Sequence, residues 1–194
     1  MVILASASPR RKEILESLGV EIKIITADID ENSNKDSFDK IAMEIAEKKC
    51  RAVSQKIKGQ TDIENLPVIS ADTVVFCDGE IMGKPHDEED ARRMLKKLSG
   101  HAHSVCTGIC VGINGKFECS AAITKVFVDE LSDAEIQAYI DSRDPFDKAG
   151  AYGIQGIFSK HIAKIEGCYF NVVGLPVNEL SKLFKKVTGK EVFN

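Results

Sequence analysis

The stretch Met1-Val-Ile-Leu-Ala-Ser-Ala-Ser-Pro-Arg-Arg11 opens the chain and decides its fold. Residues 2–5 form a short apolar run, which predicts a buried strand. Ser8 and Pro9 are typical of an N-cap and of the first position of a helix. An apolar stripe follows until Gly19, where we expect that helix to end. The sequence therefore predicts a strand, a turn of small residues and a helix in immediate succession.

This strand–turn–helix unit is suited to binding an anion. The first N–H groups of a helix have no partner within the helix, and the helix dipole is positive at that end. Arg10 and Arg11 lie in this first turn, where cations are unfavourable for helix stability. A bound phosphate would offset that repulsion. The alternative is an ordinary capped helix with two solvated arginines.

The composition limits the class of protein. The chain has 194 residues, of which 43% are hydrophobic and 29% charged, and its net charge is −4. These values are typical of one globular domain and argue against a broad nucleic-acid surface. No apolar run reaches the roughly 20 residues that a membrane helix needs, and no signal-peptide pattern is visible. The six cysteines form no Cys-x-x-Cys pair, so we expect buried free thiols in a cytoplasmic protein.

Alternating strand and helix patterns predict an α/β protein with a mixed sheet. Strands are expected at residues 2–5, 21–27, 66–76, 105–113, 116–128 and 161–165. Helices are expected at residues 9–18, 38–53, 87–98, 132–140 and 178–187. Asn114-Gly115 predicts a two-residue hairpin turn, and Ser132-Asp-Ala-Glu135 is typical of a capping box.

Asp72 stands inside the apolar run of residues 66–76. An ionised carboxylate in a buried strand is costly unless a cation or hydrogen bonds satisfy it. Two functional interpretations are therefore open, a metal ligand and a general base. The alternative is a strand-end aspartate that reaches water.

Two later segments could join Asp72. The Gly83-Lys-Pro85 turn could return Lys84 towards it, although such a tripeptide is often a plain turn. Residues 144–156 contain three glycines beside Asp147, Lys148 and Gln155. This pattern suits a loop whose backbone approaches a ligand, and the alternative is a flexible surface loop. His101 and His103 have no third ligand nearby, so we do not expect a metal site there.

Four motifs in register resemble the Maf family of nucleoside triphosphate pyrophosphatases. They are Ser6-Ala-Ser-Pro-Arg-Arg11, Ala71-Asp-Thr73, Gly83-Lys-Pro85 and Asp147-Lys-Ala-Gly-Ala-Tyr-Gly-Ile-Gln-Gly156. The similarity covers nearly the whole chain, as a single domain over residues 1–194. It implies hydrolysis of nucleoside triphosphates to the monophosphate and pyrophosphate, and a part in clearing non-canonical nucleotides. It also implies an elongated mixed β-sheet with flanking helices, in two lobes around a central cleft.

The resemblance implies roles for individual residues. The catalytic set is Asp72, Lys84, Glu31 and Lys49, and the substrate-binding set is Ser8, Arg10, Arg11, Thr73, Lys148 and Gln155. Asp72 and Glu31 would hold a divalent metal cation, which could be Mg²⁺, Mn²⁺ or Co²⁺. The last motif resembles the branch that acts on dTTP and UTP, in which Arg10, Thr73 and Gln155 choose the base. An amide such as that of Gln155 offers a donor and an acceptor that match N3–H and O4 of uracil or thymine.

The expected partner is a nucleoside triphosphate, with no membrane and no stable nucleic-acid complex, and the resemblance suggests a homodimer. His101-Ala102 stands where the family usually has Arg-Thr, and Asp144 where it usually has Glu. One alternative is a non-catalytic nucleotide-binding regulator of cell division, which would bind nucleotide without releasing pyrophosphate. Another is a binding module for a different phosphorylated metabolite.

Overall fold

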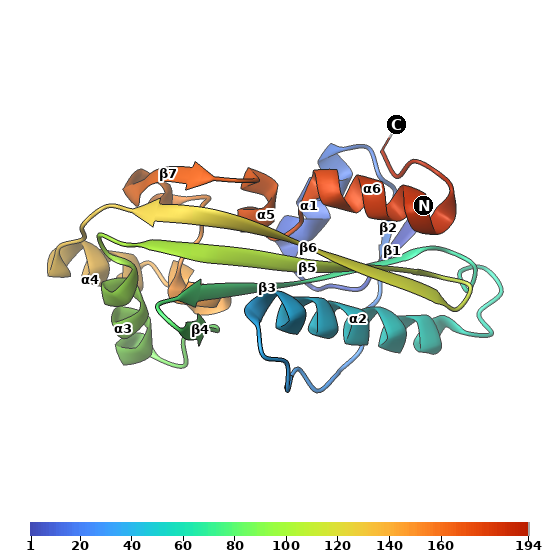
Figure 1. Ribbon diagram of the computed structural model, residues 1–194, viewed down its shortest axis with the longest axis horizontal. Helices are drawn as coiled ribbons and strands as arrows, with labels where there is room; N and C mark the ends of the chain where they lie inside the picture. Colours follow the sequence, from blue (N-terminus) through green and yellow to red (C-terminus); the bar gives the residue numbers. More distant parts are fainter. Residues whose placement is uncertain (194) are drawn as a thin grey trace. The chain divides into compact units, whose positions relative to one another are not determined.

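The computed structural model describes residues 1–193. Seven strands form a mixed sheet with the order β2-β1-β3-β5-β6-β7, and β4 pairs with β3 (Figure 1). The β1–β2 and β1–β3 pairs are parallel, whereas β3–β4 and β6–β7 are antiparallel. The strands are β1 Val2–Leu4, β2 Ile22–Ile24, β3 Val68–Cys77, β4 Glu80–Met82, β5 Ala102–Ile113, β6 Lys116–Val128 and β7 Ile162–Glu166.

Six α-helices and three short 3₁₀ turns complete the described chain. The helices are α1 Pro9–Ser17, α2 Phe38–Ile57, α3 Glu88–Leu98, α4 Asp133–Asp141, α5 Tyr169–Val173 and α6 Val177–Thr188. The 3₁₀ turns are η1 Asp144–Asp147, η2 Ala149–Ala151 and η3 Ile157–His161. The predicted mixed α/β class is confirmed.

Several predicted boundaries are wrong. The strand predicted at residues 21–27 is only Ile22–Ile24, at the edge of the sheet. The helix predicted to end at residue 53 continues to Ile57, because Val53 and Ile57 are both buried in the core. The short elements β4 and α5 and the 3₁₀ turns were not predicted.

The chain divides into two compact units, whose boundaries fall within β3, β5 and β6 and directly after α5. The first unit contains Met1–Asp72, Thr107–Ala122 and the residues from Gly174. In it, α2 covers one face of the strands, while α1 and α6 lie on the other (Figure 1). Apolar side chains of α2 pack against those of β1, β3 and β5, including Cys50, Ile3, Val68 and Cys110.

The predicted hairpin turn lies in this first unit. Asn114 and Gly115 connect β5 to β6, and both have positive φ, at 49° and 78°. Such a pair of left-handed residues matches the twist of two-stranded hairpins.

Four of the six cysteines are buried and all six are free thiols.

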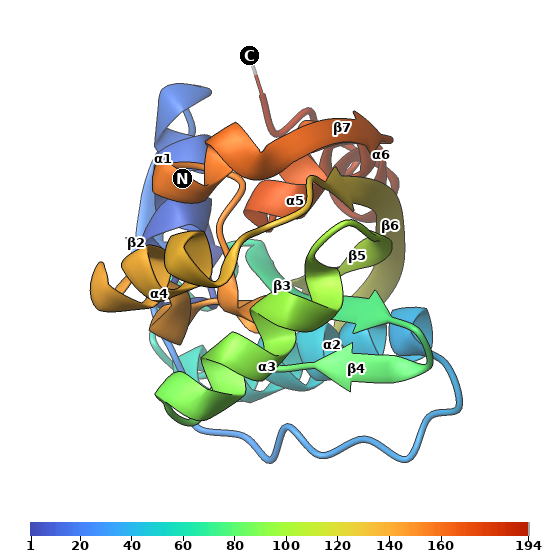
Figure 2. The ribbon, with the colours of Figure 1, turned by 90° about the vertical axis from the view of Figure 1, so that its left-hand side faces the viewer.

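The second unit contains Thr73–Cys106 and Ile123–Val173. Its core joins α3 and α4 to the strands, with Met94, Leu95 and Ile140 fully or almost fully buried. Figure 2 shows α3 beside the β3–β4 pair. The predicted capping box opens α4, where the Ser132 hydroxyl accepts from the Glu135 backbone N–H and the Glu135 carboxylate accepts from that of Ser132.

Candidate active site

The topology of the first unit marks a place for a ligand. The chain passes from β1 through α1 to β2 and then through α2 to β3, with β1 between its two parallel neighbours. Since α1 and α2 cover opposite faces (Figure 1), β1 and β3 form a topological switch point, where open α/β sheets bind ligands beyond the strand carboxyl ends. Ser6–Ser8 follow β1, and Asp72 stands three positions beyond Ile69, which pairs with Leu4.

One lysine lies between two carboxylates at this switch point. Nζ of Lys49, on α2, is 2.7 Å from Oδ1 of Asp72 and 2.8 Å from Oε1 of Glu31. The Lys49 and Asp72 side chains are only 19% and 14% exposed, whereas Glu31 is 60% exposed. The neighbouring Lys48 instead contacts the carbonyl of Asn32. The cation therefore satisfies the carboxylate that the sequence placed in a buried strand.

Arg11 is a second, buried cation of the same unit. Its Nε donates to the carbonyl oxygen of Gly174 at 2.8 Å, and its Nη1 donates to Oγ of Ser6 at 2.9 Å. Burial lowers the pKa of Arg11 from its ordinary value, while the charges of Asp72 and Glu31 raise it. Arg11 thus lies in the electrostatic field of both carboxylates and also fixes the turn after β1.

The start of α1 has the expected geometry with one difference. Ser8 occupies the N-cap position and Pro9 the first turn, but within residues 1–193 the Ser8 side chain makes no capping hydrogen bond. Its backbone N–H instead donates to Ser6 Oγ at 3.3 Å. No acidic residue stands in the first turn, where Arg10 and Arg11 lie. This helix end therefore presents positive potential to an anion.

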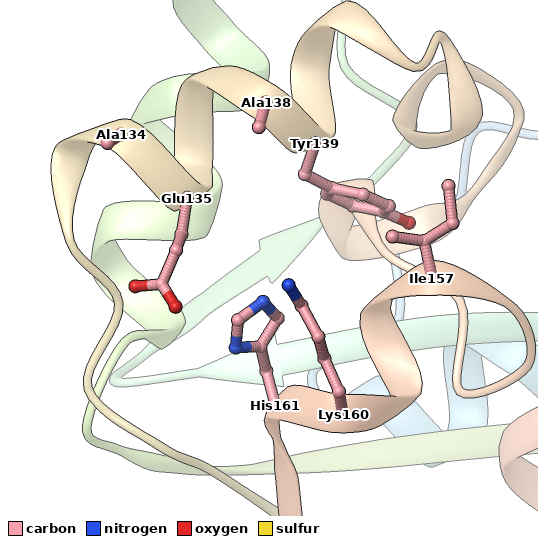
Figure 3. A pocket seen from close by; sticks show the side chains of 7 residues that line it. All are labelled: Ala134, Glu135, Ala138, Tyr139, Ile157, Lys160 and His161. Atoms are coloured by element: carbon pink, nitrogen blue, oxygen red, sulfur yellow. The ribbon is translucent and has the colours of Figure 1, made fainter.

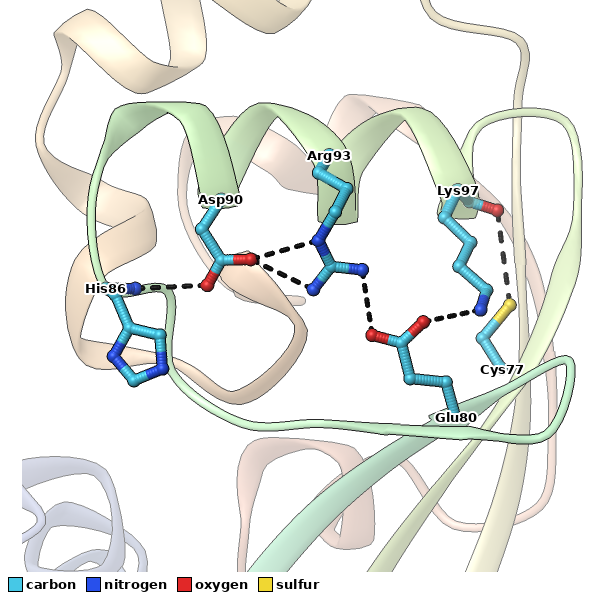
Figure 4. A network of polar contacts seen from close by, with 6 residues as sticks. All are labelled: Cys77, Glu80, His86, Asp90, Arg93 and Lys97. Atoms are coloured by element: carbon cyan, nitrogen blue, oxygen red, sulfur yellow. Dashed lines mark hydrogen bonds and ion pairs between the residues drawn. The ribbon is translucent and has the colours of Figure 1, made fainter.

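Lys84 lies in an exposed turn of the second unit, between β4 and α3. The Glu80 carboxylate binds Arg93 at 2.8 Å and Lys97 at 2.6 Å, and so joins β4 to α3 on either side of that turn (Figure 4). The backbone N–H of Gly150 donates to the carbonyl of Gly83 at 3.0 Å. The Lys84 turn is therefore bonded to the loop formed by residues 144–156.

Part of the segment formed by residues 144–156 is packed into the core. Ala151 and Tyr152 are buried, and the Tyr152 hydroxyl is 2.7 Å from Nε2 of His103. Burial lowers the pKa of His103 to about 4, so this imidazole is neutral near pH 7 and serves the core. Gln155 is exposed, which leaves its amide open to a ligand.

The ten implied site residues fall into two groups, one in each unit. Glu31, Lys49, Asp72 and Arg11 share the first unit with Ser8 and Arg10, whereas Thr73, Lys84, Lys148 and Gln155 belong to the second. Sequence reasoning did not single out Ser6, whose hydroxyl ties Arg11 to the turn. Ser6 begins the Ser6–Arg11 motif of the family resemblance, but the motif implied no individual role for it.

A pocket of about 230 Å³ lies elsewhere in the second unit, between α4 and η3. Lys160 and His161 point from η3 towards α4, with Tyr139 and Ile157 beside them (Figure 3). None of the implied site residues lines this pocket.

Among residues 1–193, no cluster of three or more His, Cys, Asp or Glu side chains is placed to hold a metal ion. None of the described helices is both long and apolar enough to cross a membrane.

The switch point, the start of α1 without acidic residues, and the paired Asp72 and Lys49 define an α/β protein whose first unit carries a positive helix N-terminus and a carboxylate held by a lysine. The model of the Maf-like protein family matches residues 1–187, and the chain belongs to the Maf family. It is 48% identical over 187 residues to a dTTP/UTP pyrophosphatase of Chromobacterium violaceum, covering 94% of this chain and 92% of that protein. It is 45% identical over 185 residues to one of Pyrococcus abyssi, covering 95% of both chains. It is 42% identical over 189 residues to a third, from Caldicellulosiruptor bescii, covering 96% of this chain and 94% of that protein.

Proposed function

We propose that this protein is a nucleoside triphosphate pyrophosphatase that hydrolyses dTTP and UTP to the monophosphate and pyrophosphate. The observation that carries the proposal is the Asp72 carboxylate, held at 2.7 Å by Lys49 at the switch point of the sheet. The shared name of the relatives supports the substrate class.

In this proposal Asp72 accepts the proton of the attacking water. The water oxygen bonds to the α-phosphorus, the bond to the bridging oxygen breaks, and pyrophosphate leaves. Lys49 orients the carboxylate for this step, because its ammonium fixes Oδ1. The first-turn N–H groups of α1, with Ser8, Arg10 and Arg11, bind the phosphates and stabilise their negative charge.

The family resemblance implies a divalent cation, and the residues present fit one. Oδ1 of Asp72 and Oε1 of Glu31 both contact the Lys49 ammonium, so the two carboxylates lie close enough together to share a cation. Carboxylate oxygens are the ligands that Mg²⁺ and Mn²⁺ prefer, and Mg²⁺ commonly uses one or two of them together with substrate phosphates. When bound, the metal would neutralise charge on the phosphates.

The family resemblance also implies roles for residues of the second unit. Lys84 would bind phosphate oxygens, and Lys148 would support nucleotide binding. Thr73 and Gln155 would recognise the base, together with Arg10 of the first unit. We propose that the whole chain acts as one domain and that it forms a homodimer, which light scattering of the purified protein would test.

The test is product analysis with the purified protein. UTP, dTTP, CTP, GTP and ATP are each incubated with Mg²⁺, Mn²⁺, Co²⁺ or EDTA, and the phosphorus products are separated. We expect monophosphate and pyrophosphate in equal amounts, fastest from UTP and dTTP, and no turnover in EDTA. Release of orthophosphate would contradict the proposed bond cleavage. Binding of nucleotides without any turnover would favour the regulator alternative.

A further inference from the structure

The ammonium of Lys148 is fully engaged by its own loop. Nζ is 2.6 Å from the carbonyl oxygen of Asp144, 2.9 Å from Oδ1 of Asp144 and 2.6 Å from Oδ1 of Asp147. A lysine ammonium has three donors, so these contacts use all of them. The side chain is 12% exposed, and a Cβ at Gly153 would lie 2.8 Å from its Cε. Lys148 therefore fastens the loop around itself.

Tyr139 of α4 links this fastened loop to the helix. Its hydroxyl donates to Oδ2 of Asp144 at 2.5 Å and accepts from the backbone N–H of Gly153 at 3.2 Å. Burial and the neighbouring Asp144 raise the pKa of Tyr139, so the hydroxyl keeps its proton and remains a donor. The Asp144 carboxylate thus joins Tyr139 to Lys148. The Tyr139 hydroxyl joins α4 to the backbone of Gly153, two positions before Gln155.

The orientation of the Gln155 side chain depends on contacts that hold the loop backbone. Gln155 is exposed and lies between Gly153 and Gly156, which has a φ of 81°. Glycines leave the backbone free to take other conformations. An amide distinguishes its donor and acceptor partners only when its orientation is fixed before binding, because ordering it on binding lowers affinity.

We propose that Tyr139 and Asp144 are positioning residues that determine base specificity, by holding the segment from Gly153 to Gln155 in one conformation. Lys148 then contributes to nucleotide binding as the cation that fixes Asp144. This inference rests on the proposed function for its substrate. It assigns selectivity to side chains that do not touch the base.

The test is Tyr139→Phe, which keeps the ring in the core and removes only the hydroxyl. We expect KM for UTP to rise about tenfold, kcat to change less than threefold, and the preference for UTP over GTP to fall at least fivefold. Asp144→Asn is expected to act in the same direction, because the Lys148 ammonium loses one of its two charged partners and the Tyr139 hydroxyl loses a charged acceptor. Asp144→Glu, which restores the charge, is expected to recover most of the selectivity.

The matched control is Ser132→Ala, which removes the N-cap of the same helix without touching the Tyr139 hydroxyl. It is expected to lower the melting temperature and leave the UTP-to-GTP ratio unchanged. The ratio is also measured from dissociation constants of UTP and GTP in EDTA, so that it does not depend on turnover. A Tyr139→Phe protein with unaltered selectivity in binding and in KM would overturn this inference. Absence of pyrophosphate release by the unmodified protein would instead overturn the proposed function.

Discussion

The ammonium of Lys49, on α2, donates a 2.7 Å hydrogen bond to Oδ1 of Asp72, on β3. Both side chains are mostly buried, at 19% and 14% exposed, so this is not a screened surface pair. In the proposed function this oriented carboxylate acts on the α–β phosphoanhydride of a bound nucleoside triphosphate.

Replacement of Asp72 with asparagine should stop the reaction and keep the fold. The amide retains the shape and an acceptor for Lys49 but cannot accept a proton. We expect kcat for UTP to fall at least about 100-fold, which is the low end of the effect of losing a general base. The control is Asp62→Asn, in an exposed loop. Near-normal pyrophosphate release by Asp72→Asn would remove Asp72 from the mechanism.

Replacement of Arg11 with alanine should lower both stability and substrate affinity. It leaves the carbonyl of Gly174 and the hydroxyl of Ser6 without their buried donor, and we expect a loss of about 2–4 kcal/mol in the free energy of unfolding. Arg11→Lys keeps the charge and loses the planar fork, so an intermediate loss is expected.

Lys12→Ala is the control for Arg11, on the same helix. Lys12 makes only an exposed 3.8 Å pair with Glu16, so the change in stability should stay within about 0.5 kcal/mol. Urea unfolding and KM for UTP measure the two effects. Equal stability losses in the Arg11 and Lys12 variants would show that the buried contacts of Arg11 do not stabilise the protein.

Replacement of Gly108 with alanine should displace α2. A Cβ at Gly108 would lie 2.3 Å from the backbone carbon of Ala42, and backbone cannot move aside as a side chain end can. We expect a loss of about 1–3 kcal/mol in the free energy of unfolding. Turnover should fall as well, because α2 carries Lys49. Gly83→Ala, where a Cβ meets no atom within 4 Å, is the control for stability alone and should leave the melting temperature unchanged.

Local patterns predicted most of this fold. The Asn114-Gly115 turn and the Ser132–Glu135 capping box act within a few residues, and both formed as expected. The predicted end of α2 at residue 53 was wrong because the burial of Ile57, a tertiary effect, extends the helix. The strand expected at residues 21–27 is short because only three of its residues pair with β1.

The site was less accessible from the sequence. The order of the motifs indicated Asp72 and Lys49, but only the crossover of α2 explains why residues 23 positions apart meet. The Lys148 pattern suggested a cation open to substrate, whereas Asp144 and Asp147 of the same loop bind it. Contacts such as that of Tyr139 with Asp144 depend on rotamers in a packed loop, and no spacing in the sequence reveals them.

Acid should destabilise the protein through His103. The imidazole is 2% exposed, its Nε2 bonds to Tyr152, and within residues 1–193 its Nδ1 has no hydrogen-bond partner. Burial lowers its pKa from 6.5 to about 4. Between these values the unfolded chain binds a proton that the folded protein does not, so stability is complete above pH 6.5 and falls towards pH 4.

Between pH 7 and pH 4.5 the His103 contribution to this loss is about 2 kcal/mol. The free energy of urea unfolding is measured at pH 7 and pH 4.5 for the unmodified protein and for His103→Gln, whose side chain stays neutral. The difference between the losses of the two proteins is the contribution of His103. His101→Gln, at an exposed position, is the control and should keep the full pH dependence. The same pH dependence in His103→Gln would assign the effect to other groups.

Replacement of Gln155 with alanine should remove base selectivity and spare the chemistry. The exposed amide is the group that can pair with both N3–H and O4 of uracil, and each such hydrogen bond contributes about 0.5–1.5 kcal/mol to binding. We therefore expect kcat/KM for UTP to fall about tenfold and that for GTP to change little, with the same dependence on divalent cation as the unmodified protein. Lys160→Ala, at an exposed position of the following 3₁₀ turn, is the control. Undiminished discrimination between UTP and GTP in Gln155→Ala would mean that the base is read by other residues, and loss of the cation dependence would mean that Gln155 serves the phosphates instead.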